Sequence, residues 1–373
     1  MNDPYVARLS QSLRIYGADH PVIAIDLNRL ESNCATARAG VDAGLEKRLV
    51  AKSLPCLPLL DQIRSLIPTS GLMTFSEPML TALLQAEGGT DHLIGKPLPV
   101  GSAARVLQAN PDAADRVQWL IDTPERLQDY LTLADQTGLS LRLSLELDIG
   151  LHRGGLSADQ VASVVKTIVA HPLARLSGVM GYEAHLAKLP SLLRPQAERR
   201  CAEAYRQAVA ALPYSGAGLC LNTGGSLTFQ AYGATGSATE VAFGSVLVKP
   251  SDFDHPSTAA FQPAAFIATP ILKTMPGNAL PGLEFLPRHK TDVAVFGGHF
   301  LAQPVYPEGF SYSSIFGRSS NQEVWTGPAS SIVQPGDIAL LRPTQSEAVL
   351  NQFGKVLAVR DGAVVQEWET LPN

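Results

Sequence analysis

Along the first two thirds of the sequence, short apolar runs alternate with longer segments in which apolar residues recur at helical spacing. Eight runs are predicted to be buried strands: Arg48 to Ser53, Leu72 to Phe75, His92 to Gly95, Gln118 to Ile121, Arg142 to Asp148, Leu176 to Tyr182, Leu219 to Asn222 and Ala238 to Phe243. Helices are predicted between them, among others over Pro78 to Glu87, Pro124 to Thr137, Ser157 to Ala170 and Leu192 to Leu212. A (β/α)8 barrel requires eight such units over roughly 200 residues, and open doubly wound sheets usually have fewer strands. The pattern therefore predicts an α/β fold built on a (β/α)8 barrel.

The pattern changes after Lys249-Pro250, where helical spacing gives way to short β-rich runs separated by Pro and Gly. The clearest predicted strands are Ala264 to Thr274, Thr291 to Phe296, Asp337 to Leu341, Lys355 to Val359 and, after an Asp361-Gly362 turn, Val364 to Trp368. We therefore expect a second, C-terminal all-β domain. The predicted division is an N-terminal segment over 1–20 packed on the β domain, a barrel over 21–249 and the β domain over 250–373.

Composition and charge exclude several classes of partner. The 373 residues are 45% hydrophobic, carry a net charge of −5 and contain no basic run with interleaved aromatic residues, so nucleic acid is not expected to bind. No apolar run is long enough to span a bilayer, and the N-terminus does not resemble a signal peptide. The four cysteines lack CxxC spacing and are expected to be free thiols: Cys34, Cys56, Cys201 and Cys220. We expect a cytoplasmic protein with no membrane partner.

Lys52 lies at the predicted mouth of the barrel, because an apolar strand runs into it and Pro55 follows three residues later. A lysine at the end of a buried parallel strand is partly desolvated, which lowers its pKa and frees its amine to form a Schiff base with a carbonyl. An ordinary solvated or ion-paired lysine is the alternative for this stretch taken alone.

Two further strand ends carry candidate chemistry, since active sites of such barrels lie at the carboxyl ends of the strands. After the fifth run, Arg153 precedes two glycines and is a candidate ligand for an anionic oxygen, unless it pairs with Glu146 or Asp148 to brace the loop. The sixth run ends with Tyr182 and His185 close together, although a lone histidine is more often structural.

The seventh and eighth runs end in glycine and hydroxyl residues, which is the composition of a phosphate site in such a barrel. The residues concerned are Asn222, Thr223, Gly224, Gly225 and Ser226 after the seventh run, and Gly244 and Ser245 after the eighth. A phosphate anchor on one side of the mouth and the Lys52 amine on the other together predict a pyridoxal phosphate site.

These motifs, in this order, resemble those of the D-threonine aldolase and D-serine dehydratase group, pyridoxal-phosphate enzymes of the alanine-racemase fold. The resemblance covers Val50 to Ser53, Leu145 to Gly155, Gly181 to His185, Asn222 to Ser226 and Glu240 to Ser245. It implies that Lys52 carries the cofactor, that Arg153 approaches its phenolic oxygen and that Tyr182 lies beside its ring. It also implies that the glycine and serine residues of the last two motifs hold the phosphate, and that the protein is a homodimer.

The sequence departs from this group where the group usually binds a divalent metal, on a histidine and an acid or cysteine two residues later. The corresponding positions hold Gln345 and Glu347. A neutral amide is a poor ligand for zinc or manganese, so no metal is expected there. The candidate bases on the substrate side are His185, Glu347 and His299, which follows another predicted strand end.

The leading hypothesis is therefore a pyridoxal-phosphate lyase that acts on a small, β-hydroxy D-amino acid, as an aldolase or a dehydratase. An amino-acid racemase is the alternative among enzymes. A non-catalytic pyridoxal-phosphate carrier and a barrel without cofactor are the alternatives outside this class. The large second domain favours an enzyme over a carrier. For a dimer, we expect the β domain of one subunit to close the barrel mouth of the other, because short loops leave that mouth open to water.

Overall fold

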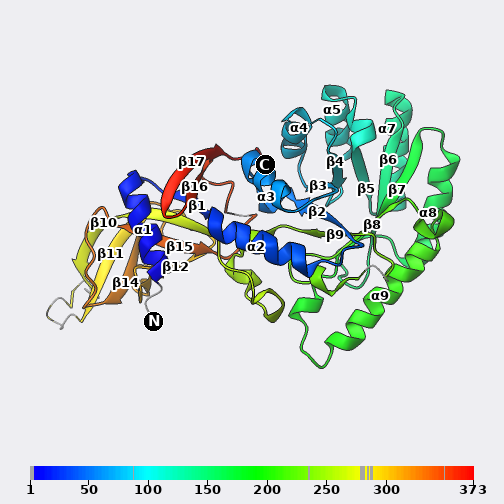
Figure 1. Ribbon diagram of the computed structural model, residues 1–373. Helices are drawn as coiled ribbons and strands as arrows, with labels where there is room; N and C mark the ends of the chain where they lie inside the picture. The colour runs from blue at the N-terminus through cyan, green and yellow to red at the C-terminus, as the bar shows by residue number, and fades with distance from the viewer. Residues whose placement is uncertain are drawn as a thin grey trace.

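The computed structural model describes residues 4–86, 88–233, 236–277, 282–283, 285, 289–347 and 349–373. It contains a closed eight-stranded barrel and a separate nine-stranded sheet, which lie side by side (Figure 1). The predicted fold class is thus confirmed. Of the predicted helix Pro78 to Glu87, the last residue lies outside the described part of the chain.

The barrel strands pair in parallel and in chain order, and β9 closes on β2. They are β2 (Glu46–Val50), β3 (Gly71–Thr74), β4 (Asp91–Ile94), β5 (Val117–Ile121), β6 (Leu141–Leu147), β7 (Ala174–Gly181), β8 (Cys220–Thr223) and β9 (Glu240–Phe243). The helices are α2 (Leu27–Gly40), α3 (Leu57–Leu66), α4 (Glu77–Ala86), α5 (Val100–Ala109), α6 (Ala113–Arg116), α7 (Pro124–Thr137), α8 (Ala158–Ala170), α9 (Arg194–Ala210) and the one-turn α10 (Ser245–Val248). Each of the eight predicted strands has a counterpart, although the first ends at Val50 and not at Ser53.

The amino-terminal end of the barrel interior is filled by charged side chains. Arg48 on β2 is 2% exposed, and its guanidinium lies 2.6 Å from the Glu240 carboxylate and 2.8 Å from that of Asp91. Arg142 pairs with the second oxygen of Asp91 at 2.5 Å. Buried charges persist only when they are paired, so this network closes the barrel floor and leaves the opposite end for chemistry.

The second sheet consists of strands from both ends of the chain. They are β1 (Val22–Asp26), β10 (Ala265–Pro276), β11 (Lys290–Phe296), β12 (Ala302–Tyr306), β13 (Ser311–Tyr312), β14 (Gln322–Pro328), β15 (Ile338–Pro343), β16 (Lys355–Arg360) and β17 (Ala363–Glu369). Strands β12, β13 and β14 were not predicted, because their apolar positions are interrupted by Pro, Gly and polar residues.

Strand β1 corrects the predicted boundary at residue 21, since it pairs with β10 and β16 and not with the barrel. Its side chains are all buried, because Val22 and Ala24 pack in one apolar cluster while Ile23 and Ile25 pack in another that extends to barrel strands. A short strand buried on both faces fits the middle of a sheet. The rest of the predicted domain division stays a prediction.

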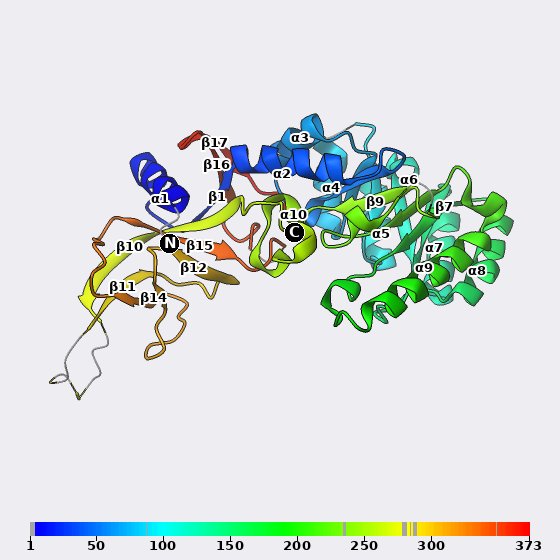
Figure 2. The same cartoon turned by 60° about the horizontal axis from the view of Figure 1, so that its bottom comes forward.

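Helix α1 (Pro4–Tyr16) lies on the second sheet in both views (Figure 1, Figure 2). Leu9 and Leu13 enter the apolar cluster that contains Val22, and the Ser10 hydroxyl donates to the Ile338 carbonyl at 2.6 Å. Within the described residues, no helix combines the length and the apolar character needed to cross a bilayer.

Candidate active site

A cavity at the carboxyl ends of the barrel strands collects most of the predicted site residues. Those that line it are Lys52, Arg153, Tyr182, Asn222, Gly224, Gly225, Ser226, Gly244, Ser245 and Glu347. They come from five different strand ends and from the second sheet. The (β/α)8 topology thus places residues far apart in the sequence around one volume.

Lys52 lies just past β2, in the 3-10 turn Ala51–Ser53. Burial lowers the pKa of its amine, and nearby Arg153 lowers that pKa further, whereas the Glu347 carboxylate opposes both. The amine lies 4.3 Å from the centroid of the Phe75 ring. A lysine of lowered pKa holds more of the neutral amine that attacks a carbonyl.

The glycine loops approach the cavity with their backbone, as a phosphate site requires. A Cβ on Gly225 would lie 2.6 Å from the Tyr182 ring, and one on Gly244 would lie 2.8 Å from the Val50 carbonyl. The Ser226 hydroxyl joins the two loops, because it accepts hydrogen bonds from the N–H groups of Gly244 at 3.3 Å and Val246 at 3.2 Å. These residues fit a phosphate group opposite the Lys52 amine.

Arg153 is exposed on the loop after β6, and its guanidinium lies 5.5 Å from the centroid of the Tyr182 ring. The Asp148 carboxylate, one of its suggested loop partners, accepts the backbone N–H groups of Gly150 and His152 and pairs with the His152 ring at 2.9 Å. The loop is therefore braced by Asp148 and His152, and Arg153 is directed to the cavity.

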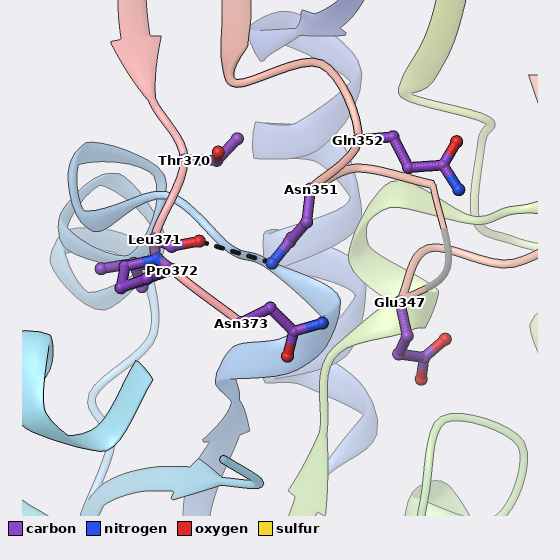
Figure 3. A pocket seen from close by; sticks show the side chains of 7 residues that line it. All are labelled: Glu347, Asn351, Gln352, Thr370, Leu371, Pro372 and Asn373. Atoms are coloured by element: carbon purple, nitrogen blue, oxygen red, sulfur yellow. Dashed lines mark hydrogen bonds between the residues drawn. The ribbon is translucent and has the colours of Figure 1, made fainter. Parts of the chain in front are cut away.

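Glu347 reaches the cavity from the second sheet, four residues after β15. Its carboxylate lies 3.6 Å from the Lys52 amine and accepts hydrogen bonds from the hydroxyls of Ser53 at 3.2 Å and Ser245 at 3.4 Å. Its side chain is 31% exposed. The same carboxylate also borders a recess formed with the C-terminal residues, where Asn351 donates to the Leu371 carbonyl at 3.4 Å (Figure 3). Glu347 therefore lies between the cavity and this recess.

The side chains at the two positions where the resembled group usually binds a metal do not fit a transition metal. The Gln345 amide donates to the Asp252 carboxylate at 3.1 Å, and Glu347 faces Lys52. Among the described residues, no group of three or more His, Cys, Asp or Glu side chains is arranged to hold a metal. One carboxylate and an amide are weak ligands for zinc or manganese.

Three predicted residues do not meet the cavity as expected. The chain turns after Glu183, so His185 faces α9 and its Nε2 lies 3.5 Å from the Cys201 sulfur. His299 is exposed beyond β11 with a φ of 50°, and it is not among the residues that line the cavity. Thr223 points outward from β8, where its hydroxyl lies 3.2 Å from the Glu183 carboxylate. His185, His299 and Thr223 thus do not line the cavity of this chain, and their expected roles as bases and as a cofactor contact stay predictions without support from its geometry.

Other lining residues had a weaker signal or none in the sequence. Phe75 ends the second predicted run, so its place at the mouth could have been inferred from the barrel pattern. Phe253 ends the short 3-10 helix Ser251–Phe253, which follows α10, and had no such signal. Asn222 lines the cavity as predicted, but its amide donates to Glu240 at 2.6 Å and so belongs to the barrel floor network.

The fold and the cavity together define a two-domain barrel protein in which the half-buried Lys52 shares a cavity with the glycine- and serine-rich loops at Gly225 and Gly244. Residues 25–252, more than half of the sequence, match the family model described as the alanine racemase N-terminal domain, and the chain belongs to this family. The family resemblance inferred from the motifs is thus confirmed.

Similar proteins agree with this assignment. The chain is 24% identical to a D-threonine aldolase of Arthrobacter sp over 371 residues, which cover 94% of this chain and 92% of the relative. The structure of D-threonine aldolase from Filomicrobium marinum has a TM-score of 0.75 at 17% identity, covering 94% of this chain and 96% of the other. The D-threo-3-hydroxyaspartate dehydratase from Delftia sp. HT23 gives 0.77 at 18% identity, with 96% and 98% covered. Alanine racemase of Clostridium difficile 630 gives 0.73 at 12% identity, with 93% and 97% covered. At these identities the structural likeness establishes the fold.

Proposed function

We propose that this protein is a pyridoxal-phosphate-dependent lyase that acts on a small β-hydroxy amino acid of D configuration. The observation that carries the proposal is the Glu347 carboxylate, which lies 3.6 Å from the Lys52 amine. The same cavity contains the loops at Gly225 and Gly244, which we call the anion cradle because they would hold the cofactor phosphate. The family match and the relatives named D-threonine aldolase and D-threo-3-hydroxyaspartate dehydratase support the same reaction class.

The residues present fit the cofactor, with Lys52 as its attachment point and the loops at Gly225 and Gly244 around its phosphate. Arg153 and Tyr182 would face its ring. When bound, pyridoxal phosphate supplies an electron sink for the bond broken at the substrate Cα. The protein then has to orient the scissile bond and move protons.

Glu347 is the base that we assign to the substrate hydroxyl. With the cofactor bound, a substrate nitrogen would occupy the position of the Lys52 amine, and a β-hydroxyl lies only three bonds from that nitrogen. A carboxylate oxygen 3.6 Å from the amine is therefore within hydrogen-bond reach of the hydroxyl. Of the three predicted bases, Glu347 is the one that lines the cavity.

Racemisation is the second candidate, because alanine racemases share the fold. It would need an acid or base opposite Lys52 on the other side of the cofactor ring. A cofactor carrier is disfavoured, since a carrier has no use for a carboxylate that the second domain brings to the lysine.

The test combines a spectrum with three substrate assays. Purified protein supplied with pyridoxal phosphate is expected to be yellow and to lose its visible band with borohydride, and Lys52→Ala should show neither band nor turnover. D-Threonine is assayed for glycine, D-threo-3-hydroxyaspartate for ammonia, and D-alanine for its L isomer. Racemisation of D-alanine without lyase activity would reject the lyase and support the racemase, and protein that stays colourless would exclude both functions.

For the assembly we propose a cytoplasmic homodimer. The four free cysteines support the cytoplasmic compartment. Apolar side chains exposed on the barrel and on the second domain support the dimer. Leu192 is 88% exposed beside the barrel mouth, and Phe316 is 51% exposed on the second domain. Light scattering at assay concentration tests the dimer, and a fully active monomer would contradict it.

A further inference from the structure

Glu183 is a buried carboxylate that the proposed reaction does not use. It follows Tyr182, its side chain is fully buried, and its carboxylate accepts hydrogen bonds from three hydroxyl groups and from its own backbone N–H. Thr228 donates to one oxygen, Thr223 lies 3.2 Å from the other, and Tyr232 also bonds to it. Burial raises the pKa of this carboxyl, while the hydroxyls oppose that shift. Burying a carboxylate among neutral groups is costly, so its presence calls for an explanation.

The two threonines bracket the glycine loop of the anion cradle. Thr223 ends β8 immediately before Gly224, and Thr228 closes the turn that follows. The Thr228 hydroxyl donates to Glu183 and accepts the N–H of Gly225 at 3.0 Å. The Thr228 hydroxyl thus links the buried Glu183 carboxylate to the backbone of the loop.

The same loop has little freedom on its cavity side. Gly225 packs so closely on Tyr182 that a Cβ would lie 2.6 Å from the ring. Because Glu183 is the next residue after Tyr182, the same strand end fixes both the Tyr182 ring and the Gly225 loop that packs on it. A displacement of Glu183 would move both parts together.

We propose that Glu183 is a positioning residue for the cofactor phosphate and acts through Thr228 on the Gly225 backbone. This inference relies on the proposed function for the identity of the cofactor, but it concerns binding and not turnover. If Glu183 only stabilised the fold, its loss would lower the free energy of unfolding without a specific loss of cofactor affinity.

The experiment is a double-mutant cycle on the affinity for pyridoxal phosphate. Glu183→Gln, Thr228→Val, their combination and Thr228→Ser are titrated with the cofactor by visible absorbance. The free energy of unfolding of each cofactor-free protein is measured by urea denaturation. Thr132→Val is the control, because Thr132 is exposed on α7 and its hydroxyl donates to the Gln128 carbonyl of the same helix.

Glu183→Gln and Thr228→Val are each expected to weaken binding by about 10- to 100-fold, as loss of outer contacts to ligand-holding groups does. The double variant should bind no more weakly than the worse single variant, because the two residues form one relay. Thr228→Ser keeps the hydroxyl and should stay within about threefold of the unmodified protein.

Three results would overturn the inference: additive losses in the double variant, failure of Thr228→Ser to retain affinity, or lowered stability with unchanged affinity. Should Glu183→Gln not fold, the comparison of Thr228→Val with Thr228→Ser decides the question alone. An unmodified protein that binds no pyridoxal phosphate would overturn the proposed function as well. Unchanged affinity for pyridoxal phosphate in every variant would overturn the inference about Glu183 and leave the proposed function standing.

Discussion

Replacing Glu347 by glutamine removes one charge at nearly constant shape and tests the proposed base. The carboxylate lies 3.6 Å from the Lys52 amine and is held by Ser53 and Ser245. A positioned general base contributes about 10²- to 10⁴-fold in rate. At about 1.4 kcal/mol per tenfold, its loss raises the barrier by roughly 3 to 5 kcal/mol. We therefore expect kcat for the lyase reaction to fall by that factor.

The same variant should keep the ability to attach the cofactor. Burial lowers the pKa of Lys52, and the Glu347 carboxylate opposes that shift. Without the carboxylate the pKa falls further, so a larger fraction of the amine is neutral near pH 7 and attachment should be as fast or faster. A stopped-flow record of the visible band measures the rate of cofactor attachment, and the rate of glycine formation from D-threonine gives kcat.

The matched control is Gln345→Ala, two residues away, whose amide bonds to Asp252 outside the cavity. It should leave both rates within about twofold, as substitutions away from a site commonly do. Lyase turnover by Glu347→Gln within threefold of the unmodified protein would refute the assignment of the base. Loss of cofactor attachment together with turnover would instead show that Glu347 is needed to build the site.

Three further outcomes are expected. Ser226→Ala and Ser245→Ala should each weaken cofactor binding by about 1 to 3 kcal/mol in an absorbance titration, because hydrogen bonds to charged groups have that strength, and unchanged affinity in both would place the phosphate elsewhere. EDTA should leave turnover unchanged in protein whose metal content is known from elemental analysis, and stoichiometric metal with chelator-sensitive turnover would contradict this. His92 on β4 is buried, neither of its ring nitrogens has a hydrogen-bond partner among the described residues, and burial lowers its pKa to about 3. Below about pH 6.5 the His92 ring is therefore protonated in the unfolded chain but stays neutral in the folded protein. Between pH 6.5 and 5 this difference should lower the free energy of unfolding by about 2 kcal/mol. His92→Leu should lack that loss in urea denaturation at the two pH values, and an unchanged pH dependence would show that His92 is not the cause.

The barrel could be predicted because strands such as β3 and β5 are buried on both faces and therefore appear in the sequence as short apolar runs. The same rule explains the error at β1, whose run Val22–Asp26 is equally apolar although it lies in the other sheet. Periodicity reports burial, whereas the choice of neighbouring strand depends on contacts far away in the sequence. The strands with mixed polarity, such as β12 with its Pro304, gave no comparable signal.

The candidate site divides in the same way. Lys52, Gly225 and Ser245 follow strands whose ends must meet, so their convergence follows from the topology once a barrel is assumed. His185 was misplaced by this reasoning, because a residue four positions past the end of β7 no longer has its direction fixed by the strand. Glu183, two positions past that end, is buried and bonds to the loop, a role that spacing could not distinguish from that of His185.

Glu347 shows why the second domain matters for the chemistry. In the proposed site the barrel supplies the lysine, the loops for the phosphate and the Tyr182 ring, and these parts alone would serve any reaction that begins with cofactor attachment. The carboxylate next to the lysine comes from the loop after β15, and β15 shares one apolar cluster with barrel residues such as Leu49 and Phe243. That common core fixes the distance between Glu347 and Lys52, and a base must be held to within a fraction of an ångström to be effective. A substitution at the shared core, such as Leu341→Ala on β15, should therefore lower kcat for the lyase reaction more than it lowers cofactor affinity, because it loosens the base while leaving the cradle within the barrel intact.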